Sequence, residues 1–136
     1  MILSEIEKEI IEDFNLFDDP LDKYEHIIDQ GNELEALEEK FKIDENLVKG
    51  CQSKVWLVSN FEDGKIFFKA DSNTVITKGV VSLLVKVLSG NEPNFIIKHE
   101  LNFLKEVGLQ EMLSSQRANG LQSMINLMKF HAEQDV

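Results

Sequence analysis

The first third of the chain has apolar residues at the spacing of amphipathic helices. Ser4 can cap the first predicted helix, because a serine oxygen there accepts from the N–H groups of the first turn. The apolar residues of this helix are Leu3, Ile6, Ile10 and Phe14. The second predicted helix begins at Pro20, with Asp19 as its N-cap, and ends near Gly31. A short third helix is expected within residues 32–44.

The middle of the chain is rich in residues that favour strands. Residues 54–61 and 66–70 predict two strands joined by an Asp-Gly turn at residues 62–65. Glycine suits this turn because a tight hairpin requires a positive φ. A short strand at residues 46–48 is expected to complete a small three-stranded antiparallel sheet, with residues 50–53 connecting two of its strands.

The rest of the chain is again helical in pattern. Residues 75–88 are apolar over most of the helix circumference and predict a central buried helix, capped by Asp71 or Ser72. A further helical piece is expected over residues 93–108, and a last helix begins near residues 114–115. Helices, then a small antiparallel sheet, then several helices that pack against it define the α+β class.

The composition is that of one globular domain, residues 1–136, with 43% hydrophobic and 29% charged residues. The net charge of −11 disfavours a sequence-independent nucleic-acid binder, which needs a basic surface. Residues 1–46 hold 16 acidic residues and 4 lysines, so this segment carries all the excess negative charge. A solvated pair of helices is the favoured interpretation, and an electrostatic docking face is the alternative.

Neither a targeting segment nor a membrane span is predicted. The start of the chain is acidic, whereas signal and transit peptides begin with basic residues. The most apolar stretch, residues 75–88, carries Lys78 and Lys86 and is too short to cross a bilayer. We therefore expect a cytoplasmic protein, whose free thiol stays reduced.

Cys51 is the leading candidate for chemistry. Because it is the only cysteine, an internal disulfide and a multi-thiolate metal site are excluded. Lys49 and Lys54 lie close in sequence, and positive charge near a thiol favours the nucleophilic thiolate. The alternative is a structural cysteine packed as a small hydrophobic residue. The small and polar residues of the predicted loop around it favour a reactive thiol; the loop is Gly50-Cys51-Gln52-Ser53.

Other enzyme classes find little support. None of the three histidines, His26, His99 and His131, lies in a predicted loop with an orienting partner, which disfavours a Cys–His hydrolase. One cysteine and three scattered histidines do not form a metal-ligand set. A glycine-rich phosphate loop is absent from the sequence.

Two residues of the predicted last helix stand out. Arg117 is the only arginine among 14 basic residues, which points to a site where the planar guanidinium cannot be replaced by lysine. Gly120 inside a helix costs about 1 kcal/mol relative to alanine. This cost suggests a close backbone approach, either to the hairpin or to the Cys51 loop.

Three segments together resemble the SufE family of sulfur-acceptor proteins in iron–sulfur cluster assembly. They are residues 48–56, residues 70–72 with 76–79, and residues 113–114 with Arg117 and 120–124. The Gly-Cys-Gln-Ser-Lys-Val-Trp run within the first segment is the specific one. The chain departs from the family at Ser115, where many members have proline, and at Asn73-Thr74, where the family has Asp-Ala.

The resemblance implies a fold shared with NifU-like cluster scaffolds and a function in sulfur transfer. A SufS-like cysteine desulfurase, which holds the pyridoxal phosphate, would pass persulfide sulfur to Cys51. The chain itself would bind no cofactor and no metal, and a SufB-like cluster scaffold would be the recipient. A single cysteine argues for a carrier, because the scaffolds use three. The alternative is an interaction domain whose Cys51 is structural.

The resemblance also assigns positions around the thiol. Cys51 resembles the family's acceptor cysteine, on a loop that swings out to the donor and folds back. The small or polar residues that would permit this movement are Gly50, Gln52 and Ser53. Asp71 and Arg117 resemble family positions near the loop or on the desulfurase-facing surface, and Lys78 is a further candidate.

Overall fold

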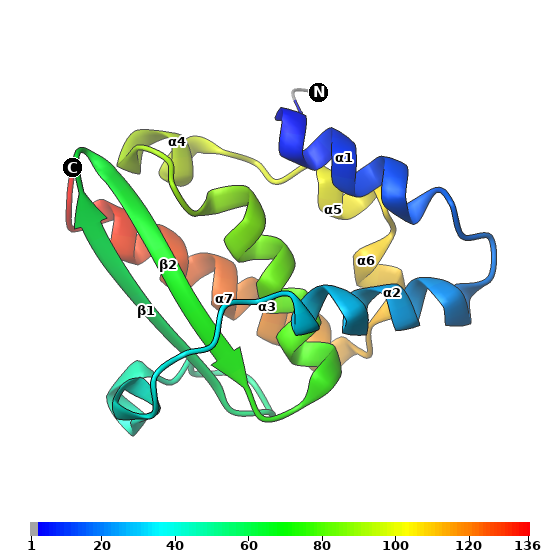
Figure 1. Cartoon of the computed structure of the whole chain (residues 1–136), viewed down its shortest axis with the longest axis horizontal. Coiled ribbons are helices and arrows are strands. Elements are labelled where there is room, and N and C mark those ends of the chain that lie inside the picture. Colours follow the sequence, from blue (N-terminus) through cyan, green and yellow to red (C-terminus); the bar gives the residue numbers. More distant parts are fainter. Residues whose placement is uncertain (1–2) are drawn as a thin grey trace.

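A long β-hairpin packs against helices in the computed structural model, which describes residues 3–136 (Figure 1). The helices are α1 (Glu5–Phe14), α2 (Pro20–Asn32), α3 (Val75–Leu88), α4 (Pro93–Lys98), α5 (Phe103–Glu106), α6 (Leu109–Met112) and α7 (Ser115–Glu133). The strands are β1 (Val55–Glu62) and β2 (Lys65–Ser72), and two short 3-10 turns precede them, η1 (Glu39–Phe41) and η2 (Asp44–Asn46). The α+β class is confirmed.

The hairpin forms as predicted, but the third strand does not. Asp63 and Gly64 both have positive φ, 53° and 79°, which the tight turn requires. The strand expected at residues 46–48 is reduced to one bridge between Leu47 and Trp56. The prediction of three strands is therefore wrong: Asn46 belongs to η2 and the Cys51 loop begins after Val48, so only two residues remain to pair.

The central position of α3 is confirmed. Figure 1 shows it between the hairpin and α2, and most of its side chains are buried. A Cβ on Gly79 would collide with the carbonyl oxygen of Ile27 on α2, so only glycine allows this approach of the two helices. The inner face of the hairpin completes the core with Val55, Leu57, Ile66, Phe68 and Ala70.

Three helix N-termini are capped by side chains, and the sequence predicted two of these caps, Ser4 and Asp19. Ser4 accepts from the N–H of Glu7, Asp19 accepts from the N–H of Leu21, and Ser114 accepts from the N–H of Arg117. The predicted cap of α3 is wrong. Asp71 and Ser72 lie in β2, and the N-cap of α3 is Thr74, whose side chain makes no capping bond.

Two predicted helices are also corrected. Between the end of α2 at Asn32 and the start of η2 at Asp44, the chain is irregular except for the short η1 turn. The helical piece expected over residues 93–108 is interrupted between α4 and α5, where Leu101 takes a positive φ of 55°. No helix within residues 3–136 is long and apolar enough to cross a membrane.

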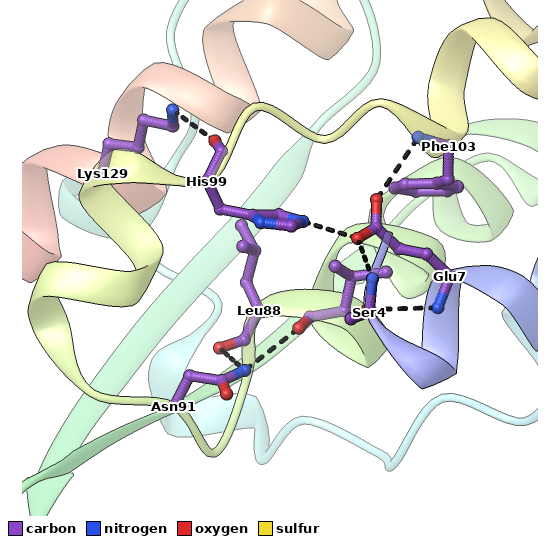
Figure 2. A network of polar contacts seen from close by, with 8 residues as sticks. Ser4, Glu7, Leu88, Asn91, His99, Phe103 and Lys129 are labelled. Carbon is purple, nitrogen blue, oxygen red and sulfur yellow. Dashed lines mark hydrogen bonds and ion pairs between the residues drawn. The ribbon is translucent and has the colours of Figure 1, made fainter. Parts of the chain in front are cut away.

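One buried carboxylate joins α1 to the segment between α4 and α5 (Figure 2). Glu7 is fully buried. Its Oε1 accepts from the N–H of Ser4 at 3.0 Å and lies 2.6 Å from Nε2 of His99. Its Oε2 accepts from the N–H of Phe103 at 3.3 Å. Lys129 on α7 donates to the carbonyl oxygen of His99 at 2.9 Å, which links the last helix to the same network.

Candidate functional site

Cys51 is half-buried on the loop between η2 and β1, and its thiol faces α7. The Sγ atom donates a weak hydrogen bond to the carbonyl oxygen of Gly120 at 3.6 Å. A Cβ on Gly120 would lie only 3.1 Å from Sγ, so a larger residue there would press on the thiol. The close approach predicted at Gly120 is confirmed, and its partner is the Cys51 loop.

A cavity of about 60 Å³ opens beside the thiol. One water molecule needs about 10–15 Å³ of such space, so the cavity has room for a small group beside the thiol. Val80 and Met124 supply apolar surface, whereas Arg117 supplies a positive charge. The complete lining consists of Cys51, Gln52, Ser53, Thr77, Val80, Gln116, Arg117, Gly120 and Met124. Three distant parts of the chain, the loop, α3 and α7, therefore meet around Sγ.

Both ends of the loop are fixed to the rest of the protein. At one end, the N–H of Val48 donates to the carbonyl oxygen of Val55 at 2.8 Å, and Gly50 has a φ of 93°, a conformation that favours glycine. At the other end, the N–H of Lys54 donates to Oδ1 of Asn73 at 2.9 Å. The carbonyl oxygen of Lys54 accepts from the hydroxyl of Ser72 at 2.8 Å. Movement of Cys51 is thus restricted to the few residues between these anchors.

Burial raises the pKa of the Cys51 thiol. The expectation that Lys49 and Lys54 favour the thiolate is wrong for this conformation. Both lysines are exposed, and neither contributes to the shift of the pKa. The folded loop therefore holds a protonated thiol rather than an activated nucleophile.

We expect the alkylation rate of Cys51 to rise with pH in both the native protein and the chain unfolded by denaturant. The midpoint of this rise should lie at a higher pH in the native protein. Only the thiolate reacts, and the raised pKa delays its formation. Iodoacetamide labelling followed by mass spectrometry over neutral to alkaline pH measures both midpoints. Since the native thiol keeps its proton to higher pH, the free energy of unfolding falls as pH rises between the two pKa values. A native midpoint below that of the unfolded chain would contradict this assignment.

Asp71 is not among the residues that line the cavity. It lies near the end of β2 between two lysines, with Lys42 at 2.9 Å and Lys78 at 3.4 Å. Burial acts to raise the pKa of Asp71, but hydrogen bonds and the two lysine charges together hold that pKa below its usual value. Lys42 also lies over the ring of Trp56, the residue paired with Asp71 across the hairpin. Asp71 therefore stabilises the base of the hairpin, which is the end where β1 begins and β2 ends.

Arg117 lies at the cavity and reaches across to α2. Its Nη1 donates to the hydroxyl of Tyr24 at 3.1 Å. Sequence reasoning identified Arg117 by its rarity but missed Tyr24, because the two are 93 positions apart. It also missed Thr77 as a residue of the site. The signal that could have identified Thr77 is a threonine within a mostly apolar helix, and the structure shows that this threonine is buried.

The three histidines lie elsewhere. His26 packs against the rings of Phe14 and Phe17. His99 contacts Glu7, and His131 lies 2.7 Å from the hydroxyl of Ser59 through its Nδ1. None of the three lines the cavity at Cys51. Residues 3–136 contain no group of three or more acidic, histidine or cysteine side chains placed to hold a metal ion.

The fold and the site define a small α+β protein that presents its single cysteine on a loop over a cavity. Residues 8–132 match the SufE family, described as an Fe-S metabolism associated domain. An uncharacterized SufE-like protein of Rhizobium meliloti is 38% identical over 92% of this chain and 93% of its own length. One from Synechocystis is 37% identical over 90% of this chain and 77% of its own length. The chain therefore belongs to the SufE family.

Two further comparisons add context. SufE-like protein 1 of Arabidopsis thaliana, described as chloroplastic/mitochondrial, is 41% identical over 90% of this chain, which covers 33% of that protein. A solution structure of a hypothetical protein from Thermus thermophilus superposes with a TM-score of 0.80. It covers 98% of both chains at 17% identity, so this likeness shows the shared fold.

Proposed function

We propose that this chain accepts persulfide sulfur from a SufS-like cysteine desulfurase onto Cys51. In doing so it stimulates the desulfurase, and it then relays the sulfur to the iron–sulfur assembly machinery through a SufB-like scaffold. The observation that carries the proposal is a lone cysteine on an anchored loop with a cavity beside its Sγ. Membership of a family associated with Fe-S metabolism supports it. The chain is a sulfur-transfer partner and not itself an enzyme.

The transfer is a thiol exchange that needs no second cysteine. The Cys51 thiolate attacks the outer sulfur of the donor persulfide, and a new S–S bond forms at Sγ. The S–S bond of the donor breaks, and its electron pair leaves on the donor cysteine as a thiolate. The outer sulfur keeps its proton, so Cys51 becomes a persulfide. A nearby second thiol would divert this sulfur by forming a disulfide, and the chain has none.

The cavity gives the transferred sulfur a protected place. Its volume of about 60 Å³ lies directly beside Sγ. Val80 and Met124 offer the new sulfur an apolar surface, since sulfur is soft and polarisable. A persulfide folded back into this space would be shielded from reductants until a recipient binds.

The loop must move outward to reach a donor. The thiol is half-buried and protonated at rest, and its bond to the Gly120 carbonyl is weak. We propose that extension exposes Sγ to water or to the desulfurase, which removes the burial that raises its pKa. Gln52, exposed at the tip of the loop, and Arg117, exposed at the cavity, face the partner. Asp71 and Lys78 act by fixing the base of the hairpin.

The remaining components belong to the partners. We propose that pyridoxal phosphate resides in the desulfurase and that this chain binds neither a cofactor nor a metal. Nucleic acids and membranes are not among the proposed partners. Residues 1–136 would act as one unit in the cytoplasm, although the Arabidopsis relative is described as organellar.

The test is direct, because the chain has a single cysteine. Incubation with a cysteine desulfurase and free cysteine should add one sulfur atom to the intact protein, and a thiol reductant should remove it. The Cys51→Ser variant should gain no sulfur and should not stimulate release of sulfur by the enzyme. Sulfur gain by the serine variant, or none by the native chain, would refute the proposal.

One observation favours the alternative, an interaction domain with a structural cysteine. Cys51 packs against the hydrophobic core, and burial raises the pKa of its thiol. A structural thiol would remain free of sulfur in the same incubation, and it would be labelled only as fast as the whole protein unfolds.

A further inference from the structure

We propose that Thr74 and Thr77 at the start of α3 hold the Cys51 loop in its retracted position through Ser53. These three residues are called the hydroxyl cluster below. The cluster would set how often the loop extends for sulfur transfer. Its importance for transfer rests on the proposed function, whereas its hold on the loop is a property of the free protein.

The cluster joins the loop directly to α3. Oγ of Ser53 accepts from Oγ1 of Thr74 at 2.8 Å and from Oγ1 of Thr77 at 3.3 Å. Ser53 is two residues from Cys51, and both Ser53 and Thr77 line the cavity at the thiol. The neighbouring Lys54 is bonded through its backbone to Asn73 and Ser72 and stays with the hairpin. The cluster therefore acts on the last residue of the loop that is free to move.

The side chain of Thr74 bonds to the Cys51 loop and not to its own helix. It occupies the N-cap position of α3, where a threonine oxygen ordinarily accepts from an N–H of the first turn. Its side chain makes no such bond. The N-cap side chains of α1, α2 and α7 all do. The hydroxyl of Thr74 instead donates to Ser53, and the first turn of α3 is left without a side-chain cap.

Thr77 is the second unusual hydroxyl. It is only 6% exposed, on a helix whose buried face is otherwise almost entirely apolar. A threonine within a helix commonly bonds to the carbonyl four residues earlier. Here it reaches a residue 24 positions away. If Ser53 moved out, this buried hydroxyl would lose its partner, and that cost favours the retracted loop.

The cluster is the stronger polar hold on the moving residues. The other contact from a side chain of the loop is the bond from Sγ to the Gly120 carbonyl, and a thiol is a weak donor. An ordinary neutral hydrogen bond shifts an equilibrium about fivefold. Removing one hydroxyl should therefore raise the extended population about fivefold.

Alkylation of Cys51 in the native protein, measured alongside the free energy of unfolding, tests this inference. Thr77→Val should label about fivefold faster than wild type, and Thr77→Ser should restore the wild-type rate. Ser53→Ala, on the loop itself, should accelerate labelling at least as much, because it removes the acceptor of both bonds. Adding Thr77→Val to Ser53→Ala should then change the rate little, because the Thr77 bond is already lost.

Ser82→Ala is the matched control. Ser82 is a buried hydroxyl on the same helix, but it donates to the carbonyl of Gly79 within α3. Its loss should leave the labelling rate unchanged. The inference is overturned if Thr77→Val and Ser53→Ala label at the wild-type rate. It is also overturned if their effects multiply in the double variant, or if labelling follows the free energy of unfolding in every variant.

The same variants separate this inference from the proposed function. With a desulfurase and free cysteine, Thr77→Val should gain its sulfur atom faster than wild type in a single turnover. If no variant gains sulfur while labelling is still accelerated, the sulfur-acceptor proposal fails and the cluster stands. If all variants gain sulfur and are labelled at the wild-type rates, the cluster proposal alone fails.

Discussion

Replacing Gly79 with alanine is expected to lower the free energy of unfolding by about 3 kcal/mol, the upper end of the usual cost of overpacking. The added Cβ would collide with the carbonyl oxygen of Ile27, a backbone atom of α2 that cannot rotate away. The facing Gly31 leaves no room either, since a Cβ there would lie 2.8 Å from the backbone nitrogen of Gly79. The helices would have to separate, and this cost exceeds the gain of about 1 kcal/mol in helix propensity.

Urea unfolding of Gly79→Ala and of a control on the same helix would measure this effect. Val75→Ala is a suitable control, because Val75 is 60% exposed and its truncation should change the free energy of unfolding by less than about 0.5 kcal/mol. A loss below 1 kcal/mol for Gly79→Ala would mean that α2 and α3 can separate at little cost. The family segment around Gly79 would then need an explanation other than helix packing.

Local signals in the sequence predicted the hairpin and the capped helices well. The Asp63-Gly64 turn and the caps at Ser4 and Asp19 each depend on residues within a few positions of one another. Short-range sterics and hydrogen bonds decide such features, so they can be read from the chain without knowing what packs against it.

Residues 32–44 show where local propensity fails. The segment has apolar residues at helical spacing, yet it is mostly irregular and runs from the end of α2 to the base of the hairpin (Figure 1). The segment is held by contacts with β2, such as the ion pairs of Glu35 with Lys69 and of Lys42 with Asp71, which the spacing of its apolar residues does not show. The break at Leu101 is similar, since nothing in a leucine signals a positive φ.

The candidate site was likewise predicted only in part. Cys51 and Gly120 were predicted from the chemistry of single residues, and the structure brings them together. The effect of Lys49 and Lys54 was misjudged because neighbours in sequence need not face the same group. Burial by α3 and α7, invisible in the sequence, determines the pKa of the thiol.

Replacing Glu7 with alanine is expected to lower the free energy of unfolding by about 3 kcal/mol, since each buried donor left without its acceptor costs about 1–3 kcal/mol. The variant would leave the N–H groups of Ser4 and Phe103 without their acceptor and would expose His99 to an empty space. Glu7→Gln should cost less than Glu7→Ala, because its amide oxygen still replaces one of the two carboxylate oxygens as an acceptor. It should remain destabilising, because the amide nitrogen cannot accept in place of the other oxygen. Glu9→Ala, exposed on the same helix, should change the free energy of unfolding by less than about 0.5 kcal/mol.

The location of this network gives the prediction a second readout. Glu7 joins α1 to the segment between α4 and α5, and neither it nor His99 lines the cavity at Cys51. The Glu7 variants should therefore unfold at lower urea concentration while their folded molecules keep the native labelling rate of Cys51. A loss of stability below about 1 kcal/mol for Glu7→Ala would show that water replaces the carboxylate. Faster labelling of the folded variant would show that α1 also restrains the Cys51 loop.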